Sequence, residues 1–320
     1  MISKVVNGLL SPPGAKAKLS ILIFHRVLEA PDPLIPDAPC AQAFERLLQW
    51  LRRSFNVLPL DEAVKRLAGN SLPARAACIT FDDGYLDNYT IAMPLLKKHG
   101  LSATFFIATQ FLDGGRMWND TLIEALRNSN LKDLDLSALG LGRWPLENLQ
   151  DTQAAIHGLL GGIKYRAPEE RDVLVAEIAR ISGSVLPNDL MMSPDHVRQM
   201  RSAGMGIGAH TCSHPILARL DDAQAEAEIR GSKQMLEELL GEAVPLFAYP
   251  NGKPGRDYEG KHAAMVARAG FKAAVTTSIG ASSGMHADLY QLPRFTPWDS
   301  TELRFGLRLA NNTRQQGKTV

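Results

Sequence analysis

Short apolar runs alternate with amphipathic segments along most of this 320-residue chain, and this alternation constrains the fold more than any other feature. The apolar runs, which we interpret as buried strands, lie at residues 19–24, 76–81, 103–108, 205–209, 244–249 and 272–277. Segments with helical spacing of apolar residues lie at 44–53, 61–67, 88–99, 193–203, 221–240 and 258–269. Strands that alternate with helices in this way are typical of a parallel sheet or barrel.

Several predicted helices carry signals at their ends. Asp61 is predicted as the N-cap of one helix, since a short carboxylate can accept a hydrogen bond from the first turn. Ser193 and Pro194 combine a capping hydroxyl with a proline at the first helical position. Gly100 and Gly241 follow the last periodic residue of two other helices, where glycine is the usual stop.

The alternation breaks between Trp118 and Leu190. Residues 122–126 and 172–181 look helical there, and no strong strand signal intervenes. Because the strands before and after this segment are needed for one sheet, we interpret it as a helical insertion at about residues 119–190. The expected organisation is therefore an N-terminal extension (1–18), a single domain (19–310) that contains the insertion, and a C-terminal tail (311–320).

The charge balance restricts the possible partners. Lys and Arg together number 35 and Asp and Glu 34, so the chain has no large excess of positive charge. A broad basic face is the usual footprint of a nucleic-acid-binding protein. We therefore expect neither nucleic acid nor an anionic membrane surface as the main partner. The sequence does not indicate an oligomeric state.

Because we find no convincing secretory signal peptide, we expect a cytoplasmic location. The apolar stretch near the N-terminus, residues 5–10, is interrupted by Asn7 and Gly8. It is shorter than the apolar region of a typical secretory signal peptide. No apolar run approaches the length of a transmembrane helix. Three cysteines do not form a disulfide framework, and buried thiols are the expected state for Cys40 and Cys78.

Two adjacent carboxylates, Asp82 and Asp83, follow the predicted strand at residues 76–81, and Gly84 follows them. In parallel α/β architectures this end of a strand faces the active site. Neighbouring side chains point in different directions, so one carboxylate can hold a cation while the other acts as a base. An ordinary solvated turn would also use Asp and Gly, and Asp-Asp-Gly alone does not exclude it.

Two histidines, His210 and His214, follow another short strand at a spacing of four residues. Pro215 disfavours helical geometry at His214, so the pair is expected on a loop or tight turn. Two imidazoles and one carboxylate form a common open zinc site that leaves a position for water. Cys212 lies between the two histidines and is expected to point away from such a site.

Two further segments have both a structural and a functional interpretation. At residues 247–252 a strand runs into Pro-Asn-Gly, which is a turn signal but which could also present a backbone N–H to a developing oxyanion. Arg294 lies in Leu-Pro-Arg-Phe and is either a surface charge or the partner of an active-site carboxylate.

Together these segments resemble the polysaccharide deacetylase family, also called the NodB homology domain or carbohydrate esterase family four. TFDDG at residues 80–84 resembles its first motif and HTCSH at 210–214 its second. FHRV at 24–27, ATFF at 103–106 and MGIGA at 205–209 resemble flanking segments of many members. The resemblance covers about residues 19–299, apart from the insertion.

The resemblance implies a distorted (β/α) barrel of about seven strands. It also implies that Asp83, His210 and His214 bind a divalent metal, usually zinc, and that Asp82 is the general base for the metal-activated water. The expected reaction is hydrolysis of an acetamide on a sugar or polysaccharide. A backbone N–H near Asn251 would stabilise the oxyanion.

The chain departs from the family pattern in two places. The third motif often begins with an arginine that orients the base, but Ala248 stands there, so we expect Arg294 to replace it. The late motif that supplies an acid histidine has no clean match. His286 is the first candidate by chain order, and His25, which we also place among substrate-binding residues, is the second.

Further substrate contacts are hypotheses. Trp118 and Asp120 offer an aromatic face and a polar group that suit a sugar ring, although Trp118 could equally pack the insertion onto the barrel. Tyr249 and Asn251 are predicted to line the same site. Alternative functions are an amidase on a small non-sugar amide, or a catalytically inactive carbohydrate-binding relative.

Overall fold

The computed structural model describes residues 7–284, 287–297 and 299–320. The chain divides into two compact units. Unit 1 comprises Met1–Pro31, Asp37–Leu112 and Met192–Val320, and unit 2 comprises Asp32–Pro36 and Asp113–Met191. Among the described residues, no helix has both the length and the apolar character needed to cross a membrane.

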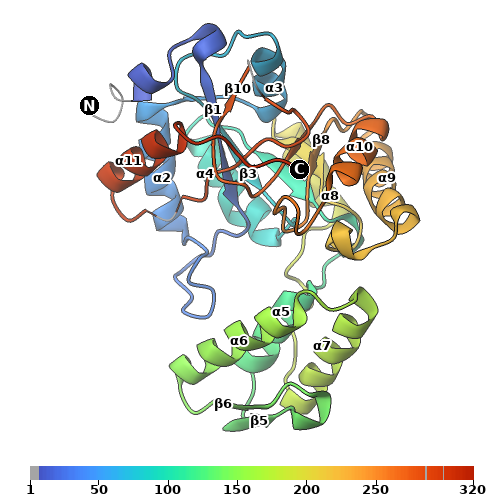
Figure 1. Cartoon of the computed structure of the whole chain (residues 1–320). Helices are drawn as coiled ribbons and strands as arrows, with labels where there is room; N and C mark the ends of the chain where they lie inside the picture. The colour runs from blue at the N-terminus through green and yellow to red at the C-terminus, as the bar shows by residue number, and fades with distance from the viewer. Residues whose placement is uncertain (1–6, 285–286, 298) are drawn as a thin grey trace. The chain divides into compact units, whose positions relative to one another are not determined.

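Unit 1 is built on a curled, mostly parallel sheet that forms a half-barrel (Figure 1). In the described part of the chain its strand order is β10-β1-β3-β4-β7-β8-β9, with β2 added beside β3. Its strands are β1 (Lys18–Phe24), β2 (Asn56–Val57), β3 (Ala76–Phe81), β4 (Thr104–Ile107), β7 (Gly206–Ala209), β8 (Leu246–Ala248), β9 (Ala273–Val275) and β10 (Ser282–Ser283). Only the β1–β10 pairing among these is antiparallel. The predicted α/β fold, a distorted barrel of about seven strands, is thus confirmed.

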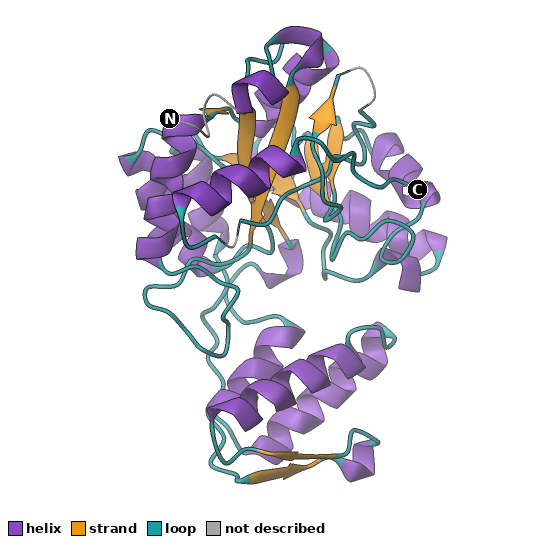
Figure 2. Ribbon diagram, turned by 60° about the vertical axis from the view of Figure 1, so that its left-hand side comes forward, coloured by secondary structure: helices purple, strands orange, loops and turns teal. Residues whose placement is uncertain are grey.

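Helices follow the strands of unit 1 and surround the sheet (Figure 2). They are α2 (Ala41–Ser54), α3 (Leu60–Ala68), α4 (Met93–Lys98), α8 (Pro194–Ser202), α9 (Asp222–Leu240), α10 (Gly260–Arg268) and α11 (Glu302–Asn312). Short turns of other helix types are η1 (Gly14–Lys16), η2 (Asn88–Ala92), η3 (Thr109–Phe111) and η5 (Leu217–Arg219). Capping side chains fix the starts of α8 and α9, where Ser193 and Asp221 accept hydrogen bonds from the first turn.

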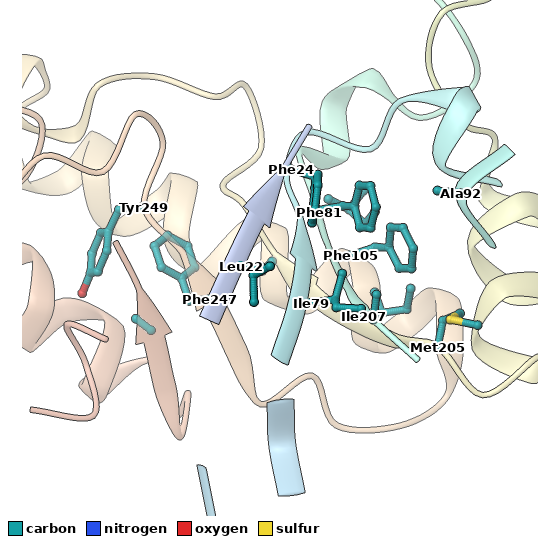
Figure 3. Close-up of a cluster of buried hydrophobic side chains, with 14 of the residues drawn as sticks. Leu22, Phe24, Ile79, Phe81, Ala92, Phe105, Met205, Ile207, Phe247 and Tyr249 are labelled. Carbon is teal, nitrogen blue, oxygen red and sulfur yellow. The ribbon is translucent and has the colours of Figure 1, made fainter. Parts of the chain in front are cut away.

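Aromatic rings fill the space between the sheet and its helices (Figure 3). Phe24, Phe81 and Phe105 come from the neighbouring strands β1, β3 and β4. Their ring centroids are 5.2 Å apart for Phe24 and Phe81 and 4.8 Å apart for Phe81 and Phe105, and both pairs are stacked. Burial of such rings is a major source of core stability. The carboxyl ends of β1 and β3, from which the chain leads into the candidate site, are therefore held rigidly.

A segment near the C-terminus, residues 292–295, closes the gap between the two sides of the half-barrel. Leu292 bridges to Val275 of β9, and Phe295 bridges to Leu22 of β1. The bonds include Leu292 N to Ala274 O (2.9 Å) and Phe295 N to Ile21 O (2.7 Å). This segment therefore belongs to the sheet's hydrogen-bond network on both sides, although it forms no regular strand.

Unit 2 is a small helical body with its own core. Its helices are α5 (Trp118–Arg127), α6 (Leu149–Ile163) and α7 (Pro168–Ser182), with a short turn η4 (Ser137–Leu139) and an antiparallel pair of β5 (Asp133–Asp135) and β6 (Arg143–Pro145). Its buried apolar residues come from all three of these helices and from residues 134–136. The predicted helical character of this segment is confirmed, but the short strand pair was not predicted.

Three local predictions are wrong. Cys40 is only partly buried, whereas Cys78 is buried as expected. Asp61 does not cap α3, because the helix begins at Leu60 with Pro59 as its N-cap, and Asp61 lies in its first turn. The single helix predicted at residues 88–99 is instead the π-helical turn η2 followed by α4. Pro94 explains this change, because it has no N–H to donate to the carbonyl one turn earlier.

Candidate metal centre

Asp82 and Asp83 follow β3 at the carboxyl end of the sheet. The N–H of Asp82 donates to Phe24 O (2.9 Å), so the backbone remains paired with β1 up to this point. Asp83 then adopts a left-handed conformation with φ of 79°. Such conformations cost about 1–3 kcal/mol for a non-glycine residue and cluster at functional sites. The turn sends the two carboxylates in different directions, and both are buried.

The loop at residues 210–214 follows β7 and carries both histidines. It is not helical, as predicted from Pro215. Thr211 and His214 are left-handed, with φ of 64° and 57°. The hydroxyl Oγ1 of Thr211 accepts a hydrogen bond from the N–H of His214 (3.1 Å). This bond closes the loop and turns the second histidine back toward the first.

The structure brings Asp83, His210 and His214 together. Oδ1 of Asp83 lies 3.4 Å from Nε2 of His210 and 3.4 Å from Nε2 of His214. One possible ligand atom from each of the three residues lies within 4.8 Å of the others. Within the described part of the chain, the buried Asp83 Oδ1 has no hydrogen-bond partner. An unsatisfied buried carboxylate oxygen facing two imidazole nitrogens fits a divalent cation.

The remaining ring nitrogen of His210 supports this interpretation. Its Nδ1 lies 2.8 Å from the carbonyl oxygen of Ala248, which can only accept a hydrogen bond. A proton must therefore be on Nδ1, so in the neutral ring, the form that binds a metal, the lone pair is on Nε2, the nitrogen that faces Asp83. Metal-bound histidines usually make such a second hydrogen bond to a carbonyl or carboxylate.

Arg294 forms a fork on Asp82. Its Nη1 donates to Oδ1 (2.7 Å) and its Nη2 to Oδ2 (2.6 Å). The guanidinium also donates through Nε to Thr276 O (2.8 Å). With 1% of its surface exposed, Arg294 is a buried residue and not a surface charge. The fork engages both carboxylate oxygens of Asp82, and each oxygen still has a second lone pair.

The charges of the site set its protonation states. Burial alone would raise the pKa of Asp82, but the Arg294 guanidinium holds it below its usual range. Burial opposes ionisation of Asp83 as well, yet contact with His210 and the proximity of His214 hold its pKa far below normal.

The two histidines differ in this respect. Burial lowers the pKa of His214 to about 3, so this ring is neutral at pH 7, as a metal ligand must be. Burial acts in the same direction on His210, but the nearby Asp82 and Asp83 carboxylates raise its pKa above the ordinary value. Two ionised carboxylates with one cationic partner, Arg294, leave a site that attracts a further positive charge.

His25 and Asn251 lie on the backbone segments that surround this cluster. His25 follows β1 directly, its side chain is exposed, and it lies within electrostatic reach of Asp82, Asp83 and His214. Asn251 has a left-handed backbone (φ 59°), and its carbonyl accepts a hydrogen bond from Thr277 Oγ1 (2.6 Å). Both positions agree with roles at the site, which remain predictions.

Three other predicted site residues have structural contacts of their own. The Tyr249 side chain is fully buried and stacks on Tyr258 with centroids 4.0 Å apart. In unit 2, a carboxylate oxygen of Asp120 accepts a hydrogen bond from the N–H of Met117 (3.0 Å) at the start of α5, and Trp118 packs on the core of that unit. Substrate contacts for Tyr249, Trp118 and Asp120 remain predictions, and His286 lies outside the described residues.

Two residues that we did not predict support the segment after β1. Asp87 Oδ1 accepts a hydrogen bond from the N–H of Val27 (3.1 Å), and its Oδ2 accepts one from Arg26 Nε (2.7 Å). Asn88 donates from its side chain to His25 O (2.8 Å). Their position shortly after the adjacent carboxylates was the only signal available in the sequence.

Comparison with known proteins decides the family. The model of the family described as "Polysaccharide deacetylase" matches residues 69–138 and 143–274, well over half of the chain. The chain belongs to the polysaccharide deacetylase family. The Bacillus subtilis (strain 168) protein YxkH, named as a candidate polysaccharide deacetylase, is 24% identical over 276 residues, which cover 85% of this chain and 70% of that protein.

Solved structures share the fold. A Streptococcus pyogenes deacetylase, PplD, solved in complex with acetate, has a TM-score of 0.60 at 20% identity and covers 93% of this chain and 98% of its own. IcaB from Ammonifex degensii has a TM-score of 0.58 at 20% identity, with 93% and 97% covered. At such identities these similarities support the half-barrel fold and say nothing by themselves about substrate.

Proposed function

We propose that this polysaccharide deacetylase family protein is a zinc-dependent hydrolase that removes N-acetyl groups from a sugar or polysaccharide. The observation that carries the proposal is the pairing of two differently used carboxylates. Asp83 faces two imidazole nitrogens at 3.4 Å, while Asp82 is held by Arg294 beside them. One carboxylate is thus arranged as a ligand and the other as a base.

Asp83, His210 and His214 would hold the divalent ion. When bound, such an ion supplies Lewis acidity, which lowers the pKa of water and polarises a carbonyl group. Asp82 would accept the proton of the attacking water, because Arg294 keeps the carboxylate ionised and fixes its plane. The backbone near Asn251 would offer an N–H to the developing oxyanion.

Proton delivery to the leaving amine needs an acid, and we propose His25 for this role. It lies at the end of β1, exposed to solvent and within electrostatic reach of Asp82 and Asp83. The alternative acid is His286. Separate His25→Gln and His286→Gln variants distinguish them, since loss of the acid removes the alkaline limb of the pH–rate profile and loss of the other histidine leaves it in place.

The function is tested by acetate release from N-acetylglucosamine oligomers. The protein is stripped of metal with a chelator, reloaded with Zn²⁺, and compared with Asp82→Asn and with a small non-sugar acetamide as substrate. Release from the oligomers that depends on zinc and on Asp82 supports the proposal. Release from the small acetamide alone indicates an amidase, and binding of the oligomers without any release indicates an inactive carbohydrate-binding relative.

A further inference from the structure

The loop that carries both histidines is held in place by a side chain from a separate element. We propose that Glu228, on α9, is a positioning residue for the metal centre and keeps His214 directed at Asp83. This inference rests on the proposed function only in treating Asp83, His210 and His214 as the metal site.

Glu228 accepts three hydrogen bonds from two consecutive loop residues. Its Oε2 accepts from the N–H of Cys212 (2.8 Å) and the N–H of Ser213 (2.9 Å). Its Oε1 accepts from Ser213 Oγ (2.7 Å). Hydrogen bonds to an ionised acceptor are roughly twice as strong as neutral ones. A single carboxylate therefore fixes both residues between Thr211 and His214.

The loop needs such support because its backbone is strained. Both Thr211 and His214 are left-handed, with φ of 64° and 57°, and neither is a glycine. Conformations of this kind persist only where the surroundings determine them. The carbonyls of Thr211 and Cys212 accept from the N–H groups of Thr109 (3.2 Å) and Gln110 (2.9 Å). Those bonds hold the loop from one side, and Glu228 holds its N–H groups from the other.

Helix α9 is well placed for this task. Ala225, Ile229 and Ser232 are buried, so the face of α9 next to Glu228 is anchored in the core. The helix also approaches the loop closely, since a Cβ added at Gly231 would lie 3.0 Å from Cys212 Sγ. The Glu228 carboxylate therefore starts from a fixed backbone and reaches the loop without a flexible intermediate.

The positioning role makes a prediction that simple loop stabilisation does not. If Glu228 only stabilised the fold, its loss would lower the stability of the metal-free protein and leave the metal affinity unchanged. If it positions His214, its loss must weaken metal binding as well, because the ligand set is no longer preorganised. Residues that orient metal ligands typically contribute about 10–100-fold in affinity.

The experiment measures zinc affinity of the full-length, metal-stripped protein by competition with a chromophoric chelator, and records the visible absorption of the Co²⁺-loaded protein. The variants are Glu228→Ala and Glu228→Gln. The matched control is Glu226→Gln, which removes an exposed ion pair with Arg230 on the same helix. Unfolding of each metal-free protein by urea gives the stability separately.

We expect Glu228→Ala to weaken zinc binding by about 10–100-fold and to change the Co²⁺ spectrum. Glu228→Gln should lose less than about tenfold, because an amide oxygen can accept from both N–H groups while its NH₂ donates to Ser213 Oγ. The Glu226→Gln control should bind zinc like the wild type. Wild-type affinity in Glu228→Ala, or an equal loss in the control, would overturn the proposal.

Two further outcomes are covered by the design. If Glu228→Ala does not fold, Glu228→Gln and Ser213→Ala carry the test, and wild-type zinc affinity in both overturns the proposal. Zinc binding is measured without substrate, so a wild-type protein that binds zinc but releases no acetate contradicts the proposed function and leaves this inference standing. A wild-type protein that binds no zinc overturns both.

Discussion

Replacing Arg294 by alanine should affect both the stability and the pH dependence of this protein through one carboxylate. Arg294 and Asp82 form a buried, two-pronged ion pair, with 0% and 3% of their side chains exposed. Removing one member of such a pair leaves an uncompensated buried charge, which typically costs about 3–5 kcal/mol. We therefore expect a loss of about that size in the free energy of unfolding at pH 7.

The pH dependence follows from the sign of the pKa shift. In the wild type the folded pKa of Asp82 is lowered, so its contribution to stability is present above the unfolded pKa and is lost as the pH falls through the folded pKa. In Arg294→Ala burial dominates and the pKa rises, so the difference between the two proteins should be largest at neutral pH and narrow in acid. The acidic limb of the pH–rate profile should move up by about 1–3 pH units.

The loss of stability is measured by urea denaturation of the metal-stripped proteins from pH 4 to 8, roughly the range over which carboxylates respond. The shift of the pH–rate profile is measured by deacetylation with the zinc-reconstituted proteins. The same substitution is then made in an Asp82→Asn background. There Arg294→Ala should cost much less, because no buried carboxylate is left unpaired. Equal costs in the two backgrounds, or an unchanged pH–rate profile, would refute the reasoning.

Four other expectations can be measured directly. Asp82→Asn should retain zinc and lose about 10²–10⁴-fold in rate, and unchanged turnover would remove Asp82 as the base. His214→Ala should abolish stoichiometric zinc in elemental analysis while circular dichroism stays native. Trp118→Ala should raise KM for an oligosaccharide more than for a small acetylated ester, whereas equal effects would favour its packing role alone. Burial lowers the pKa of His262, and its Nδ1 accepts a hydrogen bond from the N–H of Glu259 (2.9 Å). The free energy of unfolding should therefore fall as the pH drops below about 6.5, because the unfolded state then binds the proton more readily. His262→Gln should flatten this decline in urea titrations, and an unaltered slope would contradict the prediction.

The sequence predicted six strands of unit 1 well because these are buried on both faces, whereas the two-residue strands β2 and β10, which are partly exposed, were not predicted. β3 appears as a continuous apolar run, and its observed bounds, Ala76–Phe81, are the predicted ones. By contrast, β8 is shorter than the apolar run at residues 244–249, since hydrophobicity marks burial and does not show where ladder pairing ends. Helix starts with a capping hydroxyl or carboxylate, such as those of α8 and α9, were also predictable.

The strand pair of unit 2 could not have been predicted by the same signal. β5 and β6 have three residues each and are largely charged or polar on their exposed sides. The two strands are linked in part by an ion pair between Arg143 and Asp133 (2.6 Å), residues that lie ten positions apart in the sequence. Periodicity needs a longer run than this to separate a strand from a loop.

At the candidate site, the sequence predicted residue types better than contacts. The adjacent carboxylates and the histidine pair each lie in one short segment, so a local motif identifies them. Glu228 has no such motif, although its spacing of three from Ala225 and four from Ser232 places it beside the buried face of α9. A carboxylate beside a buried helical face, with no basic residue one turn away to pair with it, is the signal that could have drawn attention to it.

The contact between Arg294 and Asp82 depends on how the half-barrel closes, which explains why chain order alone left Arg294 ambiguous. Leu292 is paired with β9 and Phe295 with β1, so the backbone of Arg294 is fixed between two strands that are not neighbours in the ladder order. Its side chain then reaches Asp82, which follows β3, the strand beside β1. An arginine supplied by this closing segment can therefore orient Asp82 without an arginine at position 248. It follows that the orientation of Asp82 is coupled to closure of the sheet. Disturbing the pairing of residues 292–295 should therefore change the orientation of Asp82 more than the positions of the candidate metal ligands.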